Sequence, residues 1–216
     1  MPAETKTDRQ FSSASTEFVW DIDDDIEAHS YLFAPVAAEL GHRGVRRVLD
    51  LGCGNGAFAG HLSDAGYEVT GLDHSSSGIA RARKNYPRLP FARHDLAQPL
   101  PAEHMRKFDA VIAIEVIEHL LLPRSLMRAA VQALRPGGVL VVTTPYHGYL
   151  KNLALAITDA MDEHWHPLRD YGHVKFFSRR TLTLLFEEFG FSEIRFRTAG
   201  RIPALAKSMI VSGRQG

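Results

Sequence analysis

The stretch Val48-Leu49-Asp50-Leu51-Gly52-Cys53-Gly54-Asn55-Gly56 decides the fold of this chain. Its apolar first half is typical of a buried strand, and the apolar spacing that begins at Ala57 predicts a helix. Between them, glycines at every second position let the backbone adopt conformations closed to other residues and approach a bound molecule closely. The free amides of the helix N-terminus face the same loop. The stretch therefore predicts a strand, a ligand-binding loop and a helix.

The composition restricts the class of protein. The 25 Lys and Arg residues balance the 25 Asp and Glu residues, so no net field attracts nucleic acid or an anionic membrane. The single cysteine, Cys53, excludes an internal disulfide and suits a reducing cytosol. Residues 1–10 lack the apolar core of a signal peptide, and no apolar run reaches membrane-spanning length. We therefore expect a cytoplasmic protein of 216 residues with one well-buried domain.

Strand and helix patterns alternate along the rest of the chain. The predicted strands are 45–51, 67–72, 90–93, 108–114 and 139–144, with a final pair at 192–198 and 206–212. The predicted helices are 57–65, 76–85, one that carries residues 126–134, and 178–189. Such alternation predicts an α/β fold whose parallel sheet is covered on both faces and binds its ligand at the carboxyl ends of the strands. The final pair lacks a crossover helix and is expected to be antiparallel.

The glycine loop supports two interpretations. Gly52-x-Gly54-x-x-Ala57 fits the dinucleotide fingerprint, with Asp73 about twenty residues on, which would indicate an NAD-binding oxidoreductase. The distinguishing residue is Asp50, an acid before the first glycine. With the Gly-x-Gly-x-Gly spacing, it makes the stretch resemble motif I of the class I S-adenosylmethionine-dependent methyltransferases, and the resemblance extends over residues 45–144. In that family the loop holds a cationic amino acid moiety, which a carboxylate attracts.

The resemblance implies both a fold and a cofactor site. The fold is a Rossmann-like, doubly wound sheet of seven strands in a three-layer sandwich, with the last strand antiparallel. Asp73 would accept hydrogen bonds from two ribose hydroxyls, and Asp95 would accept from the adenine amino group with Leu96 beside the ring. The residues expected to hold S-adenosylmethionine are Asp50, Gly52, Gly54, Gly56, Asp73, Asp95, Leu96 and Glu115.

The fourth strand ends in Glu115-Val116-Ile117-Glu118-His119-Leu120. If a helical turn starts here, Glu115, Glu118 and His119 share one face and could bind Mg²⁺ or another divalent metal. The stretch resembles two metal-using branches of the family, the ubiquinone-biosynthesis O-methyltransferases and the small-RNA terminal 2′-O-methyltransferases. In both, a further histidine arrives after the fifth strand, for which His173 is the candidate. Alternatively, Glu115 contacts the cofactor, and His119 packs or acts as a base without metal.

The predicted chemistry is methyl transfer to a nucleophile by in-line attack on a sulfonium carbon. A hydroxyl acceptor needs help to lose its proton at neutral pH, either from a histidine or from a metal. His147, His164 and His166 also follow the fifth strand, but His119 and His173 are the predicted catalytic residues. We expect a small, phenolic acceptor. The alternatives are the RNA 3′-terminal 2′-O-methyltransferase and, with less support, the NAD-binding oxidoreductase.

Two segments outside the core motifs are candidate lids. Residues 1–44 form an N-terminal tail, expected to be disordered to about 16, and a lid helix, while 45–216 form the methyltransferase domain. Phe18, Trp20 and Tyr31 either cover the cofactor or pack against the domain. Residues 145–177 are a substrate-lid insertion with an apolar stripe at helical spacing. The insertion would wall the acceptor or touch a membrane that holds it.

Overall fold

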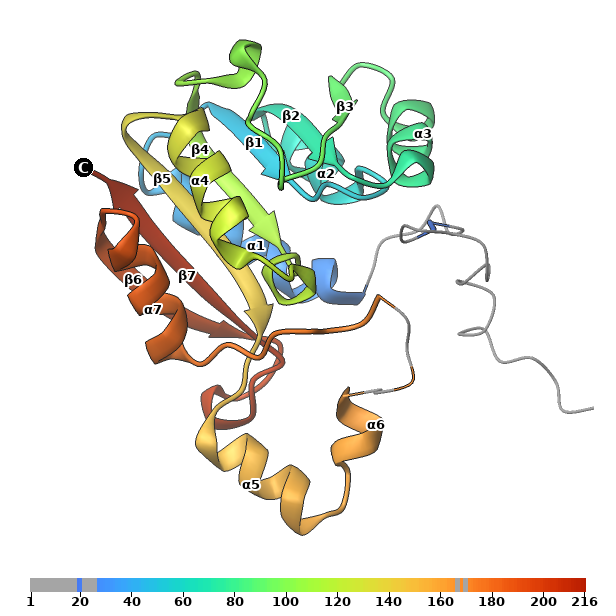
Figure 1. The fold of residues 1–216 in the computed structure, drawn as a ribbon, viewed down its shortest axis with the longest axis vertical. Coiled ribbons are helices and arrows are strands. Elements are labelled where there is room, and N and C mark those ends of the chain that lie inside the picture. The colour runs from blue at the N-terminus through green and yellow to red at the C-terminus, as the bar shows by residue number, and fades with distance from the viewer. Residues whose placement is uncertain (1–18, 21–26, 166–167, 169–170) are drawn as a thin grey trace, which may run out of the picture.

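One mixed sheet organises the molecule. The computed structural model describes residues 19–20, 27–165, 168 and 171–216; the predicted disordered tail, Phe18 and His166 lie outside these residues. Within the described ranges, seven strands follow the order β3-β2-β1-β4-β5-β7-β6 (Figure 1). The strands are β1 (Arg47–Leu51), β2 (Glu68–Asp73), β3 (Phe91–Arg93), β4 (Phe108–Ile114), β5 (Leu134–Pro145), β6 (Phe191–Ala199) and β7 (Ser208–Gln215).

Strand β1 lies at the point where the strand order reverses. Leu49 pairs with Thr70 of β2 on one side and with Val111 of β4 on the other, both in parallel register. Strand β7 runs antiparallel between β5 and β6. The predicted Rossmann-like sheet with its antiparallel last strand is therefore confirmed. A reversal of this kind leaves a crevice at the carboxyl ends of the strands beside β1.

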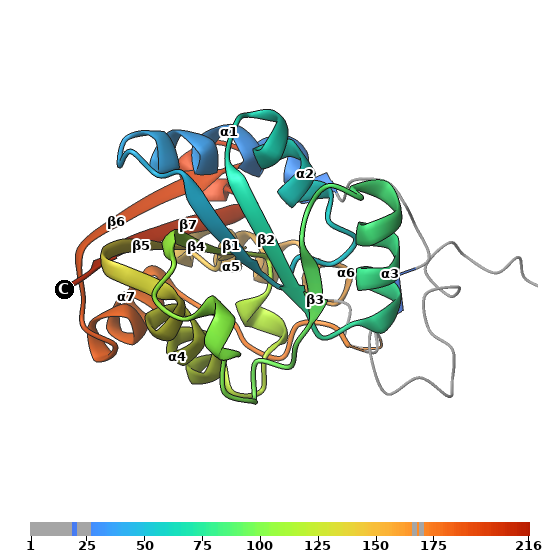
Figure 2. The ribbon, with the colours of Figure 1, turned by 90° about the horizontal axis from the view of Figure 1, so that it is seen from above.

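Helices cover both faces of the sheet, as the predicted three-layer sandwich requires. Figure 2 shows α1 and α2 over one face and α4 and α7 over the other. One apolar cluster contains Leu32, Phe58 and Ile112, and the cluster on the opposite face contains Leu126 and Leu182. The helices are α1 (Glu27–Gly41), α2 (Ala57–Asp64), α3 (Ser76–Asn85), α4 (Pro123–Ala133), α5 (Tyr149–Ile157), α6 (Met161–Trp165) and α7 (Arg179–Glu188).

Local signals set the beginnings of the helices. Gly56 precedes α2 with a φ of +81°, which turns the chain from the loop into the helix. The hydroxyl of Ser75 caps α3 by accepting a hydrogen bond from the Gly78 amide at 3.1 Å. Ser178 and Thr181 form a reciprocal capping box at the start of α7. These signals explain why α2, α3 and α7 begin within one residue of their predicted starts.

The start of β5 differs from the prediction. The sequence suggested a turn at 135–138 before a strand from 139, whereas β5 already begins at Leu134. Leu134 pairs with Phe108, and the ladder to β4 resumes at Ala110 and Val139, so residues 135–138 bulge out between two paired segments. Both the turn and the strand are therefore present in this segment.

The insertion between β5 and α7 projects beyond the carboxyl ends of β4 and β5, where Figure 1 shows α5 and α6. It shares few contacts with the sheet, and α5 instead packs against a short 3₁₀ turn, Pro203–Leu205. None of the helices that the structure describes is long and apolar enough to cross a bilayer. The insertion thus stands at the edge where the ligand is expected.

Candidate active site

The glycine-rich loop joins β1 to α2 at the carboxyl edge of the sheet. The amides of Gly52 and Cys53 donate hydrogen bonds to the Leu72 carbonyl near the end of β2, at 2.7 and 3.1 Å. Gly52 has a φ of +86°, and a β-carbon there would collide with the Val116 side chain just beyond β4. Glycine meets both requirements, so the loop fits closely between the two neighbours of β1.

Asp73 fixes the loop from the end of β2. Its Oδ2 accepts a hydrogen bond from the Gly54 amide at 2.8 Å, and its Oδ1 accepts one from the Ser75 amide at 2.7 Å. A carboxylate oxygen has two lone pairs, so each oxygen retains acceptor capacity for a ligand hydroxyl. The carboxylate can therefore position the loop and bind the predicted ribose together.

Asp95 follows β3 at the same edge. It is exposed, and its Oδ1 accepts a hydrogen bond from the Ala97 amide at 2.8 Å. Leu96 is half-buried and packs against the apolar cluster on the α4 face. The turn closed by this hydrogen bond orients the second carboxylate oxygen of Asp95, which suits the predicted adenine contact.

Asp50 is a buried acid whose carboxyl group is incompletely hydrogen-bonded by the described residues. The residue is 1% exposed, and its Oδ2 has no hydrogen-bond partner among the described residues. Burial, and then the charge of Asp73, raise the pKa of Asp50 to about 8. A cationic ligand would favour the ionised form and restore the lost interactions. The cationic amino acid portion of S-adenosylmethionine fits this requirement.

Asp50→Asn is expected to stabilise the free protein and weaken cofactor binding. Because the pKa of Asp50 rises from 3.8 to about 8 on folding, the folded state keeps a proton that the unfolded chain has lost. The free energy of unfolding of the parent therefore falls as the pH rises through this range, and that of the variant does not. We expect a difference of about 1–3 kcal/mol at pH 8 that shrinks toward pH 4. Thermal unfolding at both pH values measures it, and a pH-independent difference would disprove the burial of an unpaired carboxyl.

Glu115 lies beyond the end of β4 in an unusual backbone conformation, with a φ of +54°. Its amide donates to Thr143 Oγ1, which in turn donates to Glu115 Oε1, both at 2.9 Å. Burial raises the pKa of Glu115 to about 7, against the opposing effects of the Thr143 and Ser208 hydroxyls and of Lys151. Glu115 is therefore oriented by β5 rather than by the turn that follows it.

A 3₁₀ turn, Ile117–His119, brings three potential metal ligands together. One ligand atom each from Glu118, His119 and His173 lies within 4.8 Å of the others. Glu118 is 1% exposed, and neither of its carboxylate oxygens has a hydrogen-bond partner in the part of the chain that the structure describes. Burial and the charge of Glu115 raise the pKa of Glu118 well above its usual range. The nearby Thr144 hydroxyl opposes this rise in pKa, although it does not form a hydrogen bond with the carboxylate. A buried carboxylate without donors would gain most from a cation.

The tautomer of His119 follows from its neighbours. Its Nδ1 lies 3.0 Å from the Tyr171 carbonyl and 3.1 Å from the Gly172 carbonyl. Carbonyl oxygens only accept hydrogen bonds, so Nδ1 carries a proton, and in the neutral imidazole the lone pair is on Nε2. A second ring nitrogen bonded to a carbonyl is usual for a metal-bound histidine. His119 is therefore prepared to act as a ligand or a base.

Backbone hydrogen bonds deliver His173 to this cluster. The Glu118 carbonyl accepts from the amides of Val174 and Lys175 at 2.9 and 3.0 Å. As a result, the rings of His119 and His173 lie edge to face with their centroids 4.8 Å apart. The sequence predicted that these histidines would meet. It also grouped Glu115 with them, but the turn begins at Ile117, and Glu115 is not among the three ligands that converge.

The insertion contributes side chains that the sequence did not single out together. The Phe176 ring lies 5.1 Å from Trp165 and 5.2 Å from His147, measured between centroids. Burial, followed by the charges of Lys151 and His164, lowers the pKa of His147 to about 4, so this ring is neutral at physiological pH. Lys151 is itself 9% exposed although it lies on the otherwise exposed α5. Phe176 lies 11 residues after Trp165 and 29 after His147, so these ring contacts depend on the folding of the insertion and no local pattern marks them.

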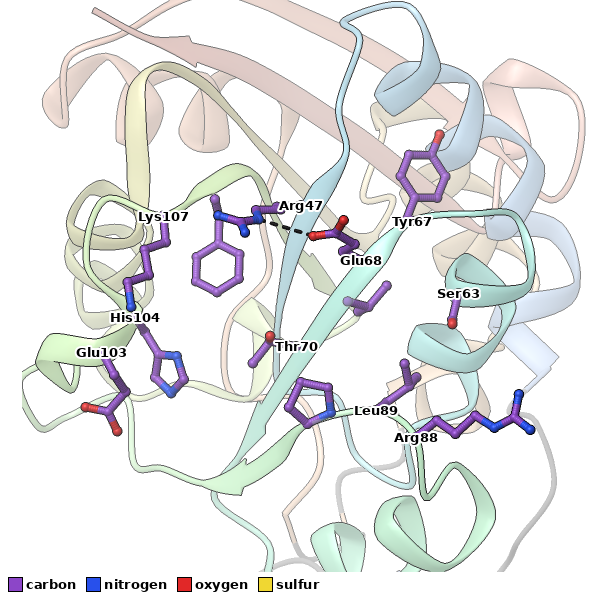
Figure 3. A pocket seen from close by; sticks show the side chains of 13 residues that line it. Arg47, Ser63, Tyr67, Glu68, Thr70, Arg88, Leu89, Glu103, His104 and Lys107 are labelled. Carbon is purple, nitrogen blue, oxygen red and sulfur yellow. Dashed lines mark hydrogen bonds and ion pairs between the residues drawn. The ribbon is translucent and has the colours of Figure 1, made fainter.

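Two cavities lie at the opposite edge of the sheet. One of about 660 Å³ is lined by the beginnings of β1, β2 and β4, including Arg47, Glu68 and Phe108 (Figure 3). The other, of about 440 Å³, lies beside Arg43 and Arg135. Ligands of open α/β sheets bind outside the carboxyl ends of the strands, so neither cavity is the predicted site.

Comparisons with known proteins find methyltransferases among the relatives of this chain. The family model described as a methyltransferase domain matches residues 26–194. A probable S-adenosylmethionine-dependent methyltransferase of Mycolicibacterium smegmatis is 38% identical over 51% of this chain and 42% of its own length. A ubiquinone biosynthesis O-methyltransferase of Aromatoleum aromaticum is 35% identical over 46% of this chain, and this chain spans 44% of it. Another, from Dinoroseobacter shibae, is 30% identical over 76% of this chain and 70% of the relative.

Solved structures share the fold. The methyltransferase domain of the bacterial protein CtHen1 aligns with a TM-score of 0.69 and 24% identity over 88% of this chain and all of that one. The magnesium protoporphyrin IX methyltransferase of Synechocystis, solved with bound SAH, aligns with a TM-score of 0.64 and 21% identity over 86% of this chain and 82% of that one. The NAD alternative is thereby set aside: the chain belongs to the S-adenosylmethionine-dependent methyltransferases.

Proposed function

We propose that this protein methylates a hydroxyl group of a small phenolic molecule with the help of a divalent metal. The observation that carries the proposal is the convergence of Glu118, His119 and His173 within 4.8 Å at the carboxyl edge of the sheet. The ubiquinone biosynthesis O-methyltransferases among the relatives support a hydroxyl acceptor. This chain spans less than half of the length of the first two relatives.

At this edge, one set of residues would bind the cofactor and another would bind the acceptor. S-adenosylmethionine supplies an electrophilic methyl group, so the protein mainly aligns the partners and removes a proton. Asp50, Asp73 and the glycine loop would hold the cofactor, with Asp95 and Leu96 at the adenine. Glu115, oriented by its hydrogen bond with Thr143, would contact the cofactor or the cluster.

The acceptor side would use the cluster of Glu118, His119 and His173. A metal bound there would lower the pKa of an acceptor hydroxyl. Nδ1 of His119 donates to the backbone carbonyls of Tyr171 and Gly172, so the lone pair of Nε2 would bind this metal or accept the acceptor's proton. Phe176, Trp165 and the neutral His147 would provide an apolar wall for an aromatic ring.

The RNA 3′-terminal alternative uses the same metal ligands but has less support. The named O-methyltransferase relatives are enzymes of ubiquinone biosynthesis. The likeness to CtHen1 is below 25% identity and shows the fold. We therefore favour the small-molecule acceptor.

The test is methyl transfer from labelled S-adenosylmethionine to a catechol and, in parallel, to a short RNA with a free 3′ end. We expect methylated catechol in the presence of Mg²⁺, and its loss on addition of a chelator. Transfer to the RNA alone would replace the proposal with the alternative. Transfer to catechol at an equal rate with and without chelator would show that the reaction needs no metal, and would leave the histidines as bases.

A further inference from the structure

The helix α5 buries a lysine and exposes apolar side chains. Lys151 is 9% exposed, whereas Tyr149, Leu150 and Ile157 of the same helix are exposed. A helix that packs on a protein normally does the reverse, and a lysine is almost never fully buried unless it is paired. Packing of apolar side chains therefore does not explain why α5 turns Lys151 inward.

The ammonium group of Lys151 lacks a counter-ion. Within the described ranges, it forms no hydrogen bond and no ion pair. Burial, and then the charge of Arg201, lower the pKa of Lys151, and the charge of Glu115 opposes them. A buried cation beside a second cation is costly, and a bound anion would favour its charged form. The surroundings of Lys151 are therefore suited to an anion.

Arg201 supplies the second cation from the connection between β6 and β7. Its side chain is exposed and likewise forms no hydrogen bond or ion pair in the part of the chain that the structure describes. The 3₁₀ turn Pro203–Leu205 follows directly and packs against α5, which keeps the connection close to the helix. Glu115 neutralises the two cations only in part, because burial raises the pKa of its carboxyl to about 7.

The neighbours of Lys151 place it on the proposed acceptor side of the site. Its charge lowers the pKa of His147, the ring that packs against Phe176 in the proposed apolar wall. It also lowers the pKa of Glu115, just beyond β4. The loop expected to hold the cofactor is bonded instead to the end of β2, through Asp73. An aromatic ring on the wall can thus direct a substituent toward Lys151.

We propose that Lys151 and Arg201 form a subsite for an anionic group of the acceptor, a carboxylate or a phosphate. We call this pair the anion subsite. The proposal rests on the proposed transfer to a small aromatic molecule, but not on the metal. The ammonium group supplies a compact charge from the inner face of α5, and the guanidinium can bind two anion oxygens side by side. The preferred acceptor is therefore a phenol that carries an acidic group.

Ligand-observed NMR tests the anion subsite without methyl transfer. Benzoate and phenyl phosphate carry an anionic group on an aromatic ring but no phenolic hydroxyl, and benzamide is the uncharged match of benzoate. Each is titrated into the protein saturated with S-adenosylhomocysteine, with a chelator present. We expect at least one of the two anions to bind at least about tenfold more tightly than benzamide. Equal affinity for the anions and benzamide, or no binding of either anion, would overturn the proposal.

Variants then assign the binding to the two cations. Lys151→Met removes the charge and keeps the length of the side chain, so the affinity for the anion should fall at least about tenfold while that for benzamide stays unchanged. Arg201→Gln should lower the affinity for the anion by about threefold, since this side chain is exposed. Lys107→Met removes a charge from an exposed position at the opposite edge of the sheet and should change neither affinity.

The remaining outcomes separate this proposal from its alternatives. Anion binding that survives in both Lys151→Met and Arg201→Gln would overturn it. If Lys151→Met does not fold, an unchanged affinity in Arg201→Gln would overturn it in its place. Weaker binding of S-adenosylhomocysteine by Lys151→Met would show that the pair binds the carboxylate of the cofactor instead. Anion binding that depends on Lys151, in a protein that methylates no phenol, would uphold the subsite and contradict only the proposed phenolic acceptor.

Discussion

Asp73→Ala is expected to lower the affinity for S-adenosylhomocysteine by at least about 100-fold, because two hydrogen bonds to a carboxylate are lost. The same carboxylate accepts hydrogen bonds from the Gly54 and Ser75 amides. The variant therefore also loosens the glycine loop, and we expect its free energy of unfolding to fall by about 1–3 kcal/mol. Calorimetric titration and chemical denaturation measure the two effects separately.

The control for this prediction is Asp64→Ala, which removes an exposed carboxylate at the end of α2. Its affinity and stability should match those of the parent. If Asp73→Ala retains the affinity of the parent while Asp64→Ala behaves as expected, the ribose assignment is wrong. If affinity falls but stability does not, the two backbone hydrogen bonds contribute less than the structure suggests.

His119→Ala is expected to abolish metal binding and, with it, any activity that depends on metal. The imidazole is one of three converging ligands, and its Nδ1 also holds the segment that carries His173 through the Tyr171 and Gly172 carbonyls. The variant loses one ligand and also the hydrogen bonds that hold the segment carrying His173. We therefore expect Mn²⁺ binding to weaken by at least about 100-fold. Electron paramagnetic resonance of free Mn²⁺ gives this affinity.

The matched control is His42→Ala, because His42 is exposed and lines the cavity at the opposite edge of the sheet. It should bind Mn²⁺ as the parent does. Glu118→Gln, which keeps the shape of the side chain, should bind as poorly as His119→Ala. Mn²⁺ binding that survives in both site variants would place the metal elsewhere or exclude it from this cluster.

Much of the fold was predictable because its signals are local. The helix at 76–85 and the strand at 108–114 have the bounds that the sequence predicted, since Ser75 caps the first and every residue of the second is buried. The bulge at 135–138 was not predicted, because it depends on how Phe108 and Leu134 pair across the sheet. Register between strands is a tertiary property that a local pattern does not contain.

In the candidate site, too, the features with local motifs were predictable and those that depend on tertiary contacts were not. The acids at the strand ends and the pairing of His119 with His173 followed from the motifs. The separation of Glu115 from the ligand cluster did not, because it depends on a positive φ and on Thr143, 28 residues away in the chain. The hydrogen bond from Arg81 to the Trp20 carbonyl and the burial of Lys151 likewise arise from contacts between distant segments. Such contacts become visible once the elements are assembled.

The proposed chemistry requires that a metal join the acceptor to the protein. Calorimetric titration of a catechol into the protein saturated with S-adenosylhomocysteine, first with Mg²⁺ and then with a chelator, examines that requirement. We predict saturable binding of the catechol with Mg²⁺ and none with the chelator. Equal binding in both solutions, or no binding in either, would show that this cluster does not present a metal to a phenolic acceptor.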